Sequence, residues 1–159
     1  MAPQKEVVLK FTSKRFRKEG VSEEQLHEFA TQQHAPRAAA IQARHAPLKV
    51  AQYHTPKACR DMLEGKLPPG WSIAEHDITI EFWVRSEAQM MEILHDPDFQ
   101  ALLAEEGDMV DAERAELTVG WEEVYVEDGK VVNVADGKSE YPPFTKSVEL
   151  AVAAGKKDT

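Results

Sequence analysis

Residues 76–84 read His-Asp-Ile-Thr-Ile-Glu-Phe-Trp-Val, and this stretch decides the fold. Apolar side chains stand at positions 78, 80, 82 and 84, and mostly polar side chains stand between them. Alternation with a period of two is typical of a strand that buries one face of a sheet. We therefore expect a strand here, with Asp77, Thr79, Glu81 and Trp83 together on the face opposite the apolar one.

The segments on either side of this strand repeat one pattern. Strands are also predicted at residues 7–12, 48–54 and 117–126. Helices are predicted at 22–34 and 86–107, and each begins with a capping box, a serine followed three residues later by a glutamine. The second is expected to restart at Asp96-Pro97, as N-cap and first helical residue, and to stop at Gly107. We expect the first helix to bend near Ala35, because Pro36 disfavours helical geometry in the residue before it.

The order strand, helix, strand, strand, helix, strand predicts a ferredoxin-like α+β fold, with a four-stranded antiparallel sheet and its helices on one face. Nothing else in the chain is left to cover the other face, so we expect a homodimer whose two sheets enclose a barrel-like interior. A pocket should lie between each sheet and its loops. Residues 1–134 are interpreted as this domain, with a hairpin at Asp128-Gly129, and residues 135–159 as a C-terminal arm that packs on a partner or is frayed.

Composition and charge narrow the classes of function. The chain has 159 residues, 42% of them apolar, which is enough for one core. The formal net charge is -9, and the one basic run, residues 14–18, is interpreted as a solvated turn, so we expect no nucleic-acid partner. The single Cys59 excludes an intramolecular disulfide, and no apolar run approaches the roughly 20 residues of a membrane helix. We therefore expect a soluble, cytoplasmic protein that binds no membrane.

Two histidines are the first candidates for catalysis. His34 lies where the first helix is expected to end, and His54 ends the strand at 48–54. Histidine titrates near neutrality, so His54 is predicted to act as acid or base, and His34 to orient the substrate or His54. Gln52 and Val50 share the parity of His54 and are predicted to bind the substrate beside it. Each histidine has a structural alternative, a hydrogen bond at the end of its strand or helix.

A carboxyl group is the third candidate. Burial on a sheet face would raise the pKa of Glu81, which could then donate a proton. Alternatively, Glu81 pairs with Arg37 or Arg44. The other side chains of this face are predicted to contact the substrate: Asp77, Thr79 and Trp83. Asp77 could instead cap the strand.

Other groups are expected to take no part in the chemistry. Parity places Tyr53 beneath the helices if the neighbouring histidine faces the cavity, and His27 is interpreted as solvated. The connection at residues 56–75 is either a lid or an irregular insert. The two candidate histidines and the carboxylate lack short metal-ligand spacing, and no glycine-rich phosphate loop is present. We therefore expect neither a metal ion nor a cofactor.

Several short motifs, in their order and spacing, resemble the EthD-domain proteins of the dimeric α+β barrel superfamily. The motifs are residues 17–25, Gln33-His34-Ala35-Pro36, Gln52-Tyr53-His54-Thr55, residues 77–83 and Val119-Gly120-Trp121-Glu122. The resemblance covers residues 7–133, most of the chain. It departs at Val50, where such proteins often carry a tyrosine, and it says nothing about the tail after Val134.

The resemblance also implies a function. Similar fungal proteins are regarded as decarboxylases of aromatic polyketide acids, which implies a cofactor-free lyase of secondary metabolism with His54, His34 and Glu81 as acid-base groups. A polyketide cyclase, dehydratase or isomerase with His54 as base is the first alternative. A non-catalytic dimer that carries a hydrophobic ligand is the second. The predicted mechanism requires His54 and Glu81 to line one water-poor chamber.

Overall fold

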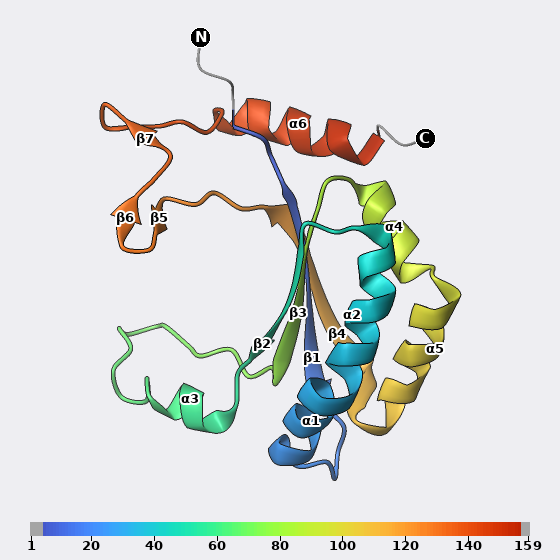
Figure 1. Ribbon diagram of the computed structural model, residues 1–159. Helices are drawn as coiled ribbons and strands as arrows, with labels where there is room; N and C mark the ends of the chain where they lie inside the picture. The colour runs from blue at the N-terminus through green and yellow to red at the C-terminus, as the bar shows by residue number, and fades with distance from the viewer. Residues whose placement is uncertain (1–4, 157–159) are drawn as a thin grey trace.

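The computed structural model describes residues 5–156, which form one four-stranded antiparallel sheet with helices packed on one of its faces (Figure 1). The strands are β1 (Leu9–Arg17), β2 (Lys49–His54), β3 (Ile78–Val84) and β4 (Val110–Trp121), in the order β2-β3-β1-β4. This arrangement is a ferredoxin-like α+β fold, as the order of the predicted elements indicated.

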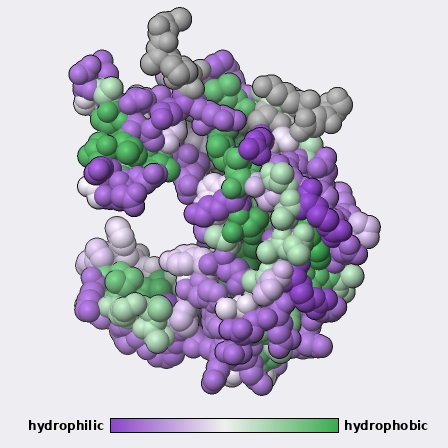
Figure 2. Space-filling view, in the orientation of Figure 1, coloured by the Kyte–Doolittle hydropathy of each residue, from purple (hydrophilic) through white to green (hydrophobic). Residues whose placement is uncertain are grey.

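The helices lie together on one face of this sheet (Figure 1). They are α1 (Glu23–Phe29), the π-helical turn η1 (Ala30–His34), α2 (Ala35–Gln42), the 3₁₀ turn η2 (Ala43–His45), α4 (Glu87–Leu94), α5 (Pro97–Glu105) and the 3₁₀ turn η3 (Glu106–Asp108). The short helix α3 (Lys57–Asp61) lies beyond the other side of the sheet with its long loop, and Figure 2 shows a hollow between this loop and the C-terminal hairpins. The helix-side face holds the core, and the opposite face is referred to below as the open face.

The alternation in residues 78–84 is confirmed as the core pattern. Ile78, Phe82 and Val84 are buried beneath the helices, and Ile80 packs against them. The main cluster of buried apolar side chains also includes Leu9, Met90, Ile93, Phe99 and Leu102. Strand and helix side chains thus meet in a single layer between sheet and helices.

The prediction that the first helix ends at His34 is wrong, because the helical segment continues through Pro36 to Gln42, while the bend near Ala35 stays a prediction. Proline lacks the N–H that would bond the carbonyl four residues earlier, and the wider π turn η1 comes just before it. The carbonyl of Ala30 accepts the N–H of Ala35 in this turn and the side-chain amide of Gln52 from β2, at 3.2 Å. His34 therefore lies in the middle of one long helical segment and not at its end. The capping box of Ser22 is confirmed at the start.

Two strands, β1 and β4, have other bounds than predicted. β1 extends to Arg17, so residues 14–17 of the basic run are part of the sheet and do not form a solvated turn. Arg15 pairs with Ile78 on one side and with Ala115 on the other. β4 begins at residue 110 and ends at residue 121, because its pairing with β1 continues to Arg17, the last residue of that longer strand.

The C-terminal segment is ordered and joins the core. β5 (Val126–Glu127) and β6 (Lys130–Val131) form the hairpin predicted at Asp128-Gly129, whose two residues have φ of 51° and 75°. β7 (Val134–Ala135) and β8 (Lys138–Ser139) form a second hairpin, and α6 (Phe144–Lys156) then packs beside α4. Ala151 of α6 touches the main core, so α6 is neither frayed nor free of the domain.

The division of the chain at residue 134 stays a prediction, and residues 1–4 and 157–159 lie outside the described residues. Over residues 5–156, no helix has both the length and the apolar content needed to cross a bilayer.

Candidate functional site

The sheet separates the predicted catalytic residues. His54 stands opposite Ile78, on the helix side, whereas Glu81 stands opposite Ala51, on the open face. The expectation that His54 and Glu81 line one chamber is therefore wrong. Parity identifies which side chains of one strand lie on the same face. The register between β2 and β3 decides which side chains of β2 share a face of the sheet with Glu81.

Glu81 belongs to a network of charges on the open face. Its carboxylate lies 3.3 Å from the ammonium of Lys10, which also pairs with Glu122 at 3.0 Å. The indole N–H of Trp83 donates to Glu122 at 2.9 Å, and the ammonium of Lys49 lies 4.5 Å from the Trp83 ring centroid. Glu81 therefore has an ion-pair partner, although it is neither of the two arginines considered from the sequence.

The other predicted contacts of this face are also remote from the helix-side histidines. Thr79 stands opposite Tyr53, which is 57% exposed on the open face, so the prediction that Tyr53 packs beneath the helices is wrong. Asp77 accepts the backbone N–H of Arg17 at 2.8 Å and pairs with its guanidinium at 3.1 Å. Asp77 thus fixes the end of β1, and no histidine is its partner in these bonds.

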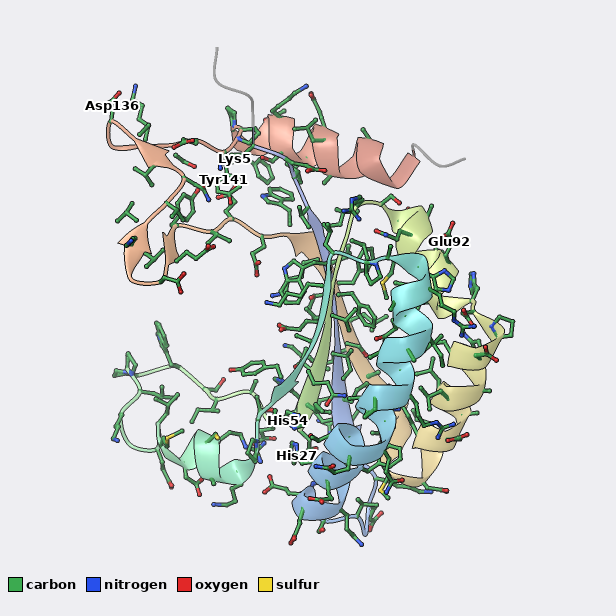
Figure 3. All side chains as sticks on the ribbon, viewed as in Figure 1. Lys5, His27, His54, Glu92, Asp136 and Tyr141 are labelled. Carbon is green, nitrogen blue, oxygen red and sulfur yellow. The ribbon has the colours of Figure 1, made fainter. Side chains whose placement is uncertain are left out.

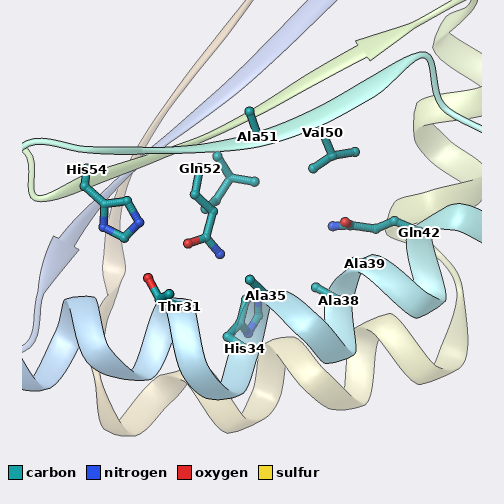
Figure 4. A pocket seen from close by; sticks show the side chains of 11 residues that line it. Thr31, His34, Ala35, Ala38, Ala39, Gln42, Val50, Ala51, Gln52 and His54 are labelled. Carbon is teal, nitrogen blue, oxygen red and sulfur yellow. The ribbon is translucent and has the colours of Figure 1, made fainter.

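Two cavities lie between the sheet and the helices. The first, the β2-side cavity, has a volume of about 310 Å³ (Figure 4). Its lining comprises Thr31, His34, Ala35, Ala38, Ala39, Gln42, Val50, Ala51, Gln52, His54 and Ile80. The second, the inner cavity, has a volume of about 240 Å³, and it shares His34, Gln42 and Ile80 with the first. Four of the predicted site residues, His34, Val50, Gln52 and His54, are thus brought together at one adjoining pair of cavities.

A buried chain of three polar side chains borders the inner cavity. Nε2 of His34 lies 3.0 Å from Oε1 of Glu106, and Nη1 of Arg15 donates to Oε2 of the same carboxylate at 2.9 Å. The His34 and Glu106 side chains are only 8% and 10% exposed. Because a carboxylate only accepts hydrogen bonds, the proton of neutral His34 resides on Nε2 and its Nδ1 carries a lone pair. Within the described residues, this buried Nδ1 and Nε of Arg15 have no hydrogen-bond partner.

The environment of His34 keeps the ring neutral. Burial is the largest influence and lowers the pKa of His34 below its ordinary value. Glu106 opposes this effect, while Arg15 and Arg37 add to it. A neutral imidazole with a free lone pair, held by a carboxylate on its other nitrogen, is the arrangement of a general base.

The side chains of His27 and His54 form a pair of imidazoles (Figure 3), and His54 of this pair lines the β2-side cavity. Nδ1 of His27 lies 2.6 Å from Nδ1 of His54, while Nε2 of His27 is buried without a partner among the described residues. A buried lone pair is tolerated better than a buried N–H, so His27 donates and His54 keeps its proton on Nε2. Burial and, to a smaller degree, His27 lower the pKa of His54. The prediction that His27 is solvated is wrong, and the catalytic role of His54 stays a prediction.

Sequence reasoning missed Arg15, Glu106 and Gln42. Arg15 has the inward parity of Leu9 and Phe11, a signal that was hidden by the assumption that β1 ends at residue 12. Gln42 follows His34 by eight residues in the same helical segment, and both side chains are buried. Glu106 follows an amphipathic helix and carries no local signal of its position.

Two further expectations concern the surroundings of the site. Residues 56–75 line neither cavity, so this connection is not a lid over the histidines in this chain. Glu81 cannot join His34 and His54 around one metal ion, because the sheet lies between them.

Comparison with known proteins places the chain among relatives of the same domain type. Residues 18–113 match the EthD domain. The chain is 36% identical over 139 residues to an Aspergillus terreus protein whose name suggests an oxygenase, covering 86% of this chain and 87% of that protein. It is 31% identical over 137 residues to the dehydratase iacD of Pestalotiopsis fici, covering 84% of this chain and 98% of that protein. A solved EthD-family protein from Bacillus halodurans is 10% identical, with a TM-score of 0.49 over 74% of this chain and 99% of its own. The domain match and the two fungal relatives show that this chain belongs to the EthD family.

Proposed function

We propose that the protein is a cofactor-free dehydratase that removes water from a β-hydroxy ketone of the aromatic polyketide type, in secondary metabolism. The observation that carries this proposal is the buried His34, whose Nε2 is bonded to Glu106 and whose Nδ1 has no partner within the described residues. Support also comes from the similarity to a fungal protein named as a dehydratase.

The proposed reaction uses two of the three buried polar groups directly. Nδ1 of His34 takes the proton from the carbon next to the substrate carbonyl, and Nε–H of Arg15 donates to the carbonyl oxygen as it becomes an enolate. The enolate then forms the carbon–carbon double bond and expels the β-hydroxyl, which takes the proton from the His34 imidazolium and leaves as water. Glu106 stabilises the imidazolium between these steps.

Decarboxylation is a second candidate reaction. It would use Arg15 at the inner cavity in place of the predicted pairing of His54 with Glu81. Loss of CO2 from a β-keto acid leaves the same enolate, and the unpaired Nε–H of Arg15 suits it equally well. The pairing of His54 with Glu81 does not support either reaction, because the sheet lies between them.

One experiment separates these reactions. The purified protein is incubated with 3-hydroxy-1-tetralone, which aromatises to 1-naphthol on losing water, and in parallel with its 2-carboxylate. We expect accelerated formation of naphthol from the first compound. Loss of CO2 from the second compound, with the hydroxyl retained, would replace the dehydratase proposal by the decarboxylase. Binding without turnover of either compound would favour a ligand carrier.

The proposed base predicts a particular pH dependence. Because burial lowers the pKa of His34, kcat/KM should be constant above the ordinary histidine value of about 6.5 and should fall only at lower pH, as Nδ1 takes a proton. In the variant Glu106→Gln the carboxylate that raises this pKa is lost, so the acid limb should move to still lower pH. The profile is measured by steady-state kinetics.

The matched control is Glu105→Gln, since Glu105 also raises the pKa of His34 but by less than Glu106 does. In this variant the acid limb of the profile of kcat/KM against pH should stay at the same pH as in the wild-type protein. A limb that is unmoved in Glu106→Gln would show that another group titrates in the reaction.

The open face supports the inference of a homodimer. Tyr53 is 57% exposed there, and Trp83 lies between two lysines in the same face. We expect a dimer by size-exclusion chromatography with light scattering, and dissociation in Tyr53→Glu, because a new charge would be buried between the sheets. Trp71→Glu changes an exposed aromatic residue of the 56–75 loop and serves as the control. A monomeric wild-type protein would contradict the inference.

A further inference from the structure

A third cavity lies between α6 and the sheet, at a distance from the histidines. Its volume is about 450 Å³, and its walls are almost entirely apolar. Leu9, Phe11 and Val119 contribute from the strands, Met91 from α4, and Val148 and Ala151 from α6. Among the described residues, Glu87 is the one ionisable residue in the lining. This space, the α6 cavity, therefore suits a hydrocarbon group better than a polar one.

The α6 cavity adjoins the proposed reaction site. Phe11 and Met91 line both the α6 cavity and the inner cavity. The inner cavity in turn carries Arg15, His34 and Glu106. An elongated molecule could thus place an oxygenated ring at the polar end and extend an apolar group past Met91 towards α6.

Apolar side chains along this path remain uncovered. Val119 and Leu117 of β4 are 66% and 77% exposed, although their register places them on the helix side of the sheet. Val152 of α6 is 52% exposed and also lines the α6 cavity. Apolar surface that faces an apolar hollow gains free energy when a hydrocarbon group displaces water from it.

We propose that the α6 cavity is a binding subsite for an apolar arm, an alkyl or alkenyl chain, of a substrate whose ring occupies the inner cavity. This inference rests on the proposed function for the position of the ring. It assigns α6 the task of selecting substrates by the length of their side chain. The C-terminal helix is then part of the binding site and not an appendage to the domain.

The test uses 4-alkylphenols, from 4-ethylphenol to 4-nonylphenol, as probes in isothermal titration calorimetry. Burial of each methylene group should lower Kd by about fourfold. The gain should stop at the chain length that fills the α6 cavity. A Kd that does not depend on chain length in the wild-type protein would overturn the proposal.

Two substitutions of the same type on α6 supply the matched comparison. Ala151→Trp fills the cavity, since Ala151 lines it. Ala153→Trp adds the same side chain two residues away, at an exposed position outside the lining. We expect Ala151→Trp to abolish the gain for long probes and to leave the Kd of 4-ethylphenol within about twofold of wild type, while Ala153→Trp keeps the full gain. An equal effect of both variants would overturn the proposal.

Further controls keep the result interpretable. Circular dichroism establishes whether Ala151→Trp keeps its helix content, and Val152→Lys, at an exposed lining position, offers a second variant that leaves the core untouched. A change of oligomeric state in Ala151→Trp, with unchanged affinity for long probes, would assign the surface to a second copy and overturn the subsite.

The subsite and the reaction can fail separately. His34→Gln should leave the dependence of Kd on chain length intact even where it removes catalysis. Conversely, dehydration of 3-hydroxy-1-tetralone, which carries no arm, together with a Kd that does not depend on chain length, would overturn the subsite alone. Dependence on chain length without any dehydration would disprove the proposed reaction alone.

Discussion

Replacing His34 with glutamine is expected to lower kcat/KM for 3-hydroxy-1-tetralone by roughly 10²- to 10⁴-fold, the contribution of a positioned general base. The glutamine amide can donate to Glu106 in place of Nε2, so the buried carboxylate keeps a partner. No atom of glutamine can replace the basic Nδ1. Steady-state kinetics, together with a thermal unfolding curve, distinguish loss of the base from loss of the fold.

His45→Gln is the matched control for this variant. His45 also lies in the helical segment and pairs with a carboxylate, Asp96, at 2.7 Å, but it lines neither the inner nor the β2-side cavity. Its kcat/KM should stay close to that of the wild-type protein. If His34→Gln kept wild-type kcat, then His34 would not be the base, and His54 would become the first group to test in its place.

Replacing Arg15 with leucine is expected to reduce the free energy of unfolding by about 3–5 kcal/mol, because the variant leaves the Glu106 carboxylate buried with only a neutral histidine beside it. The Arg15 and Glu106 side chains are 18% and 10% exposed, so solvent cannot replace the lost partner without rearrangement. Urea denaturation at pH 7, followed by circular dichroism, measures the loss.

Two further variants test whether the loss of stability comes from the buried ion pair. Arg44→Leu breaks a pair with Asp98 in which the two side chains are 51% and 67% exposed, and a longer contact with Asp96 at 3.6 Å. Because Asp96 keeps His45 as a partner, this variant should cost less than about 1 kcal/mol. The double variant Arg15→Leu, Glu106→Leu removes both charges and should recover much of the stability. A loss in Arg15→Leu no larger than that in Arg44→Leu would show that water reaches Glu106.

The parts of the fold that local chemistry determines could be predicted from the sequence. Alternation in residues 78–84 identified the central strand, because side chains of a strand alternate between faces whatever the strand pairs with. The capping box at Ser22 and the turn at Asp128-Gly129 involve neighbouring residues only, and the structure contains both. At Ser86 the predicted side-chain cap is present, but the Gln89 side chain accepts the N–H of Arg85.

The candidate site could be predicted only in part, because it depends on distant partners. Gln52, Val50, His34 and His54 were expected to lie together and do line one cavity. The register between strands, which places Glu81 on the other face, has no signature within either strand. The contact of Arg15 with Glu106 joins residues 91 positions apart, and its prediction would have required the packing of η3 against β1.

The π turn at Ala30–His34 has a consequence for the spacing of the buried side chains along the helical segment. Leu26, Ala30, His34, Ala38 and Gln42 are all buried, and they recur at every fourth position. In an uninterrupted α-helix this spacing would carry the stripe around the axis by about 40° per step, or about 160° in all. The one additional residue of the wide turn takes back about 100° of this drift. Ala38 and Gln42 thus stay on the same side of the helical segment as Leu26. His34 lies in the π turn that keeps them there.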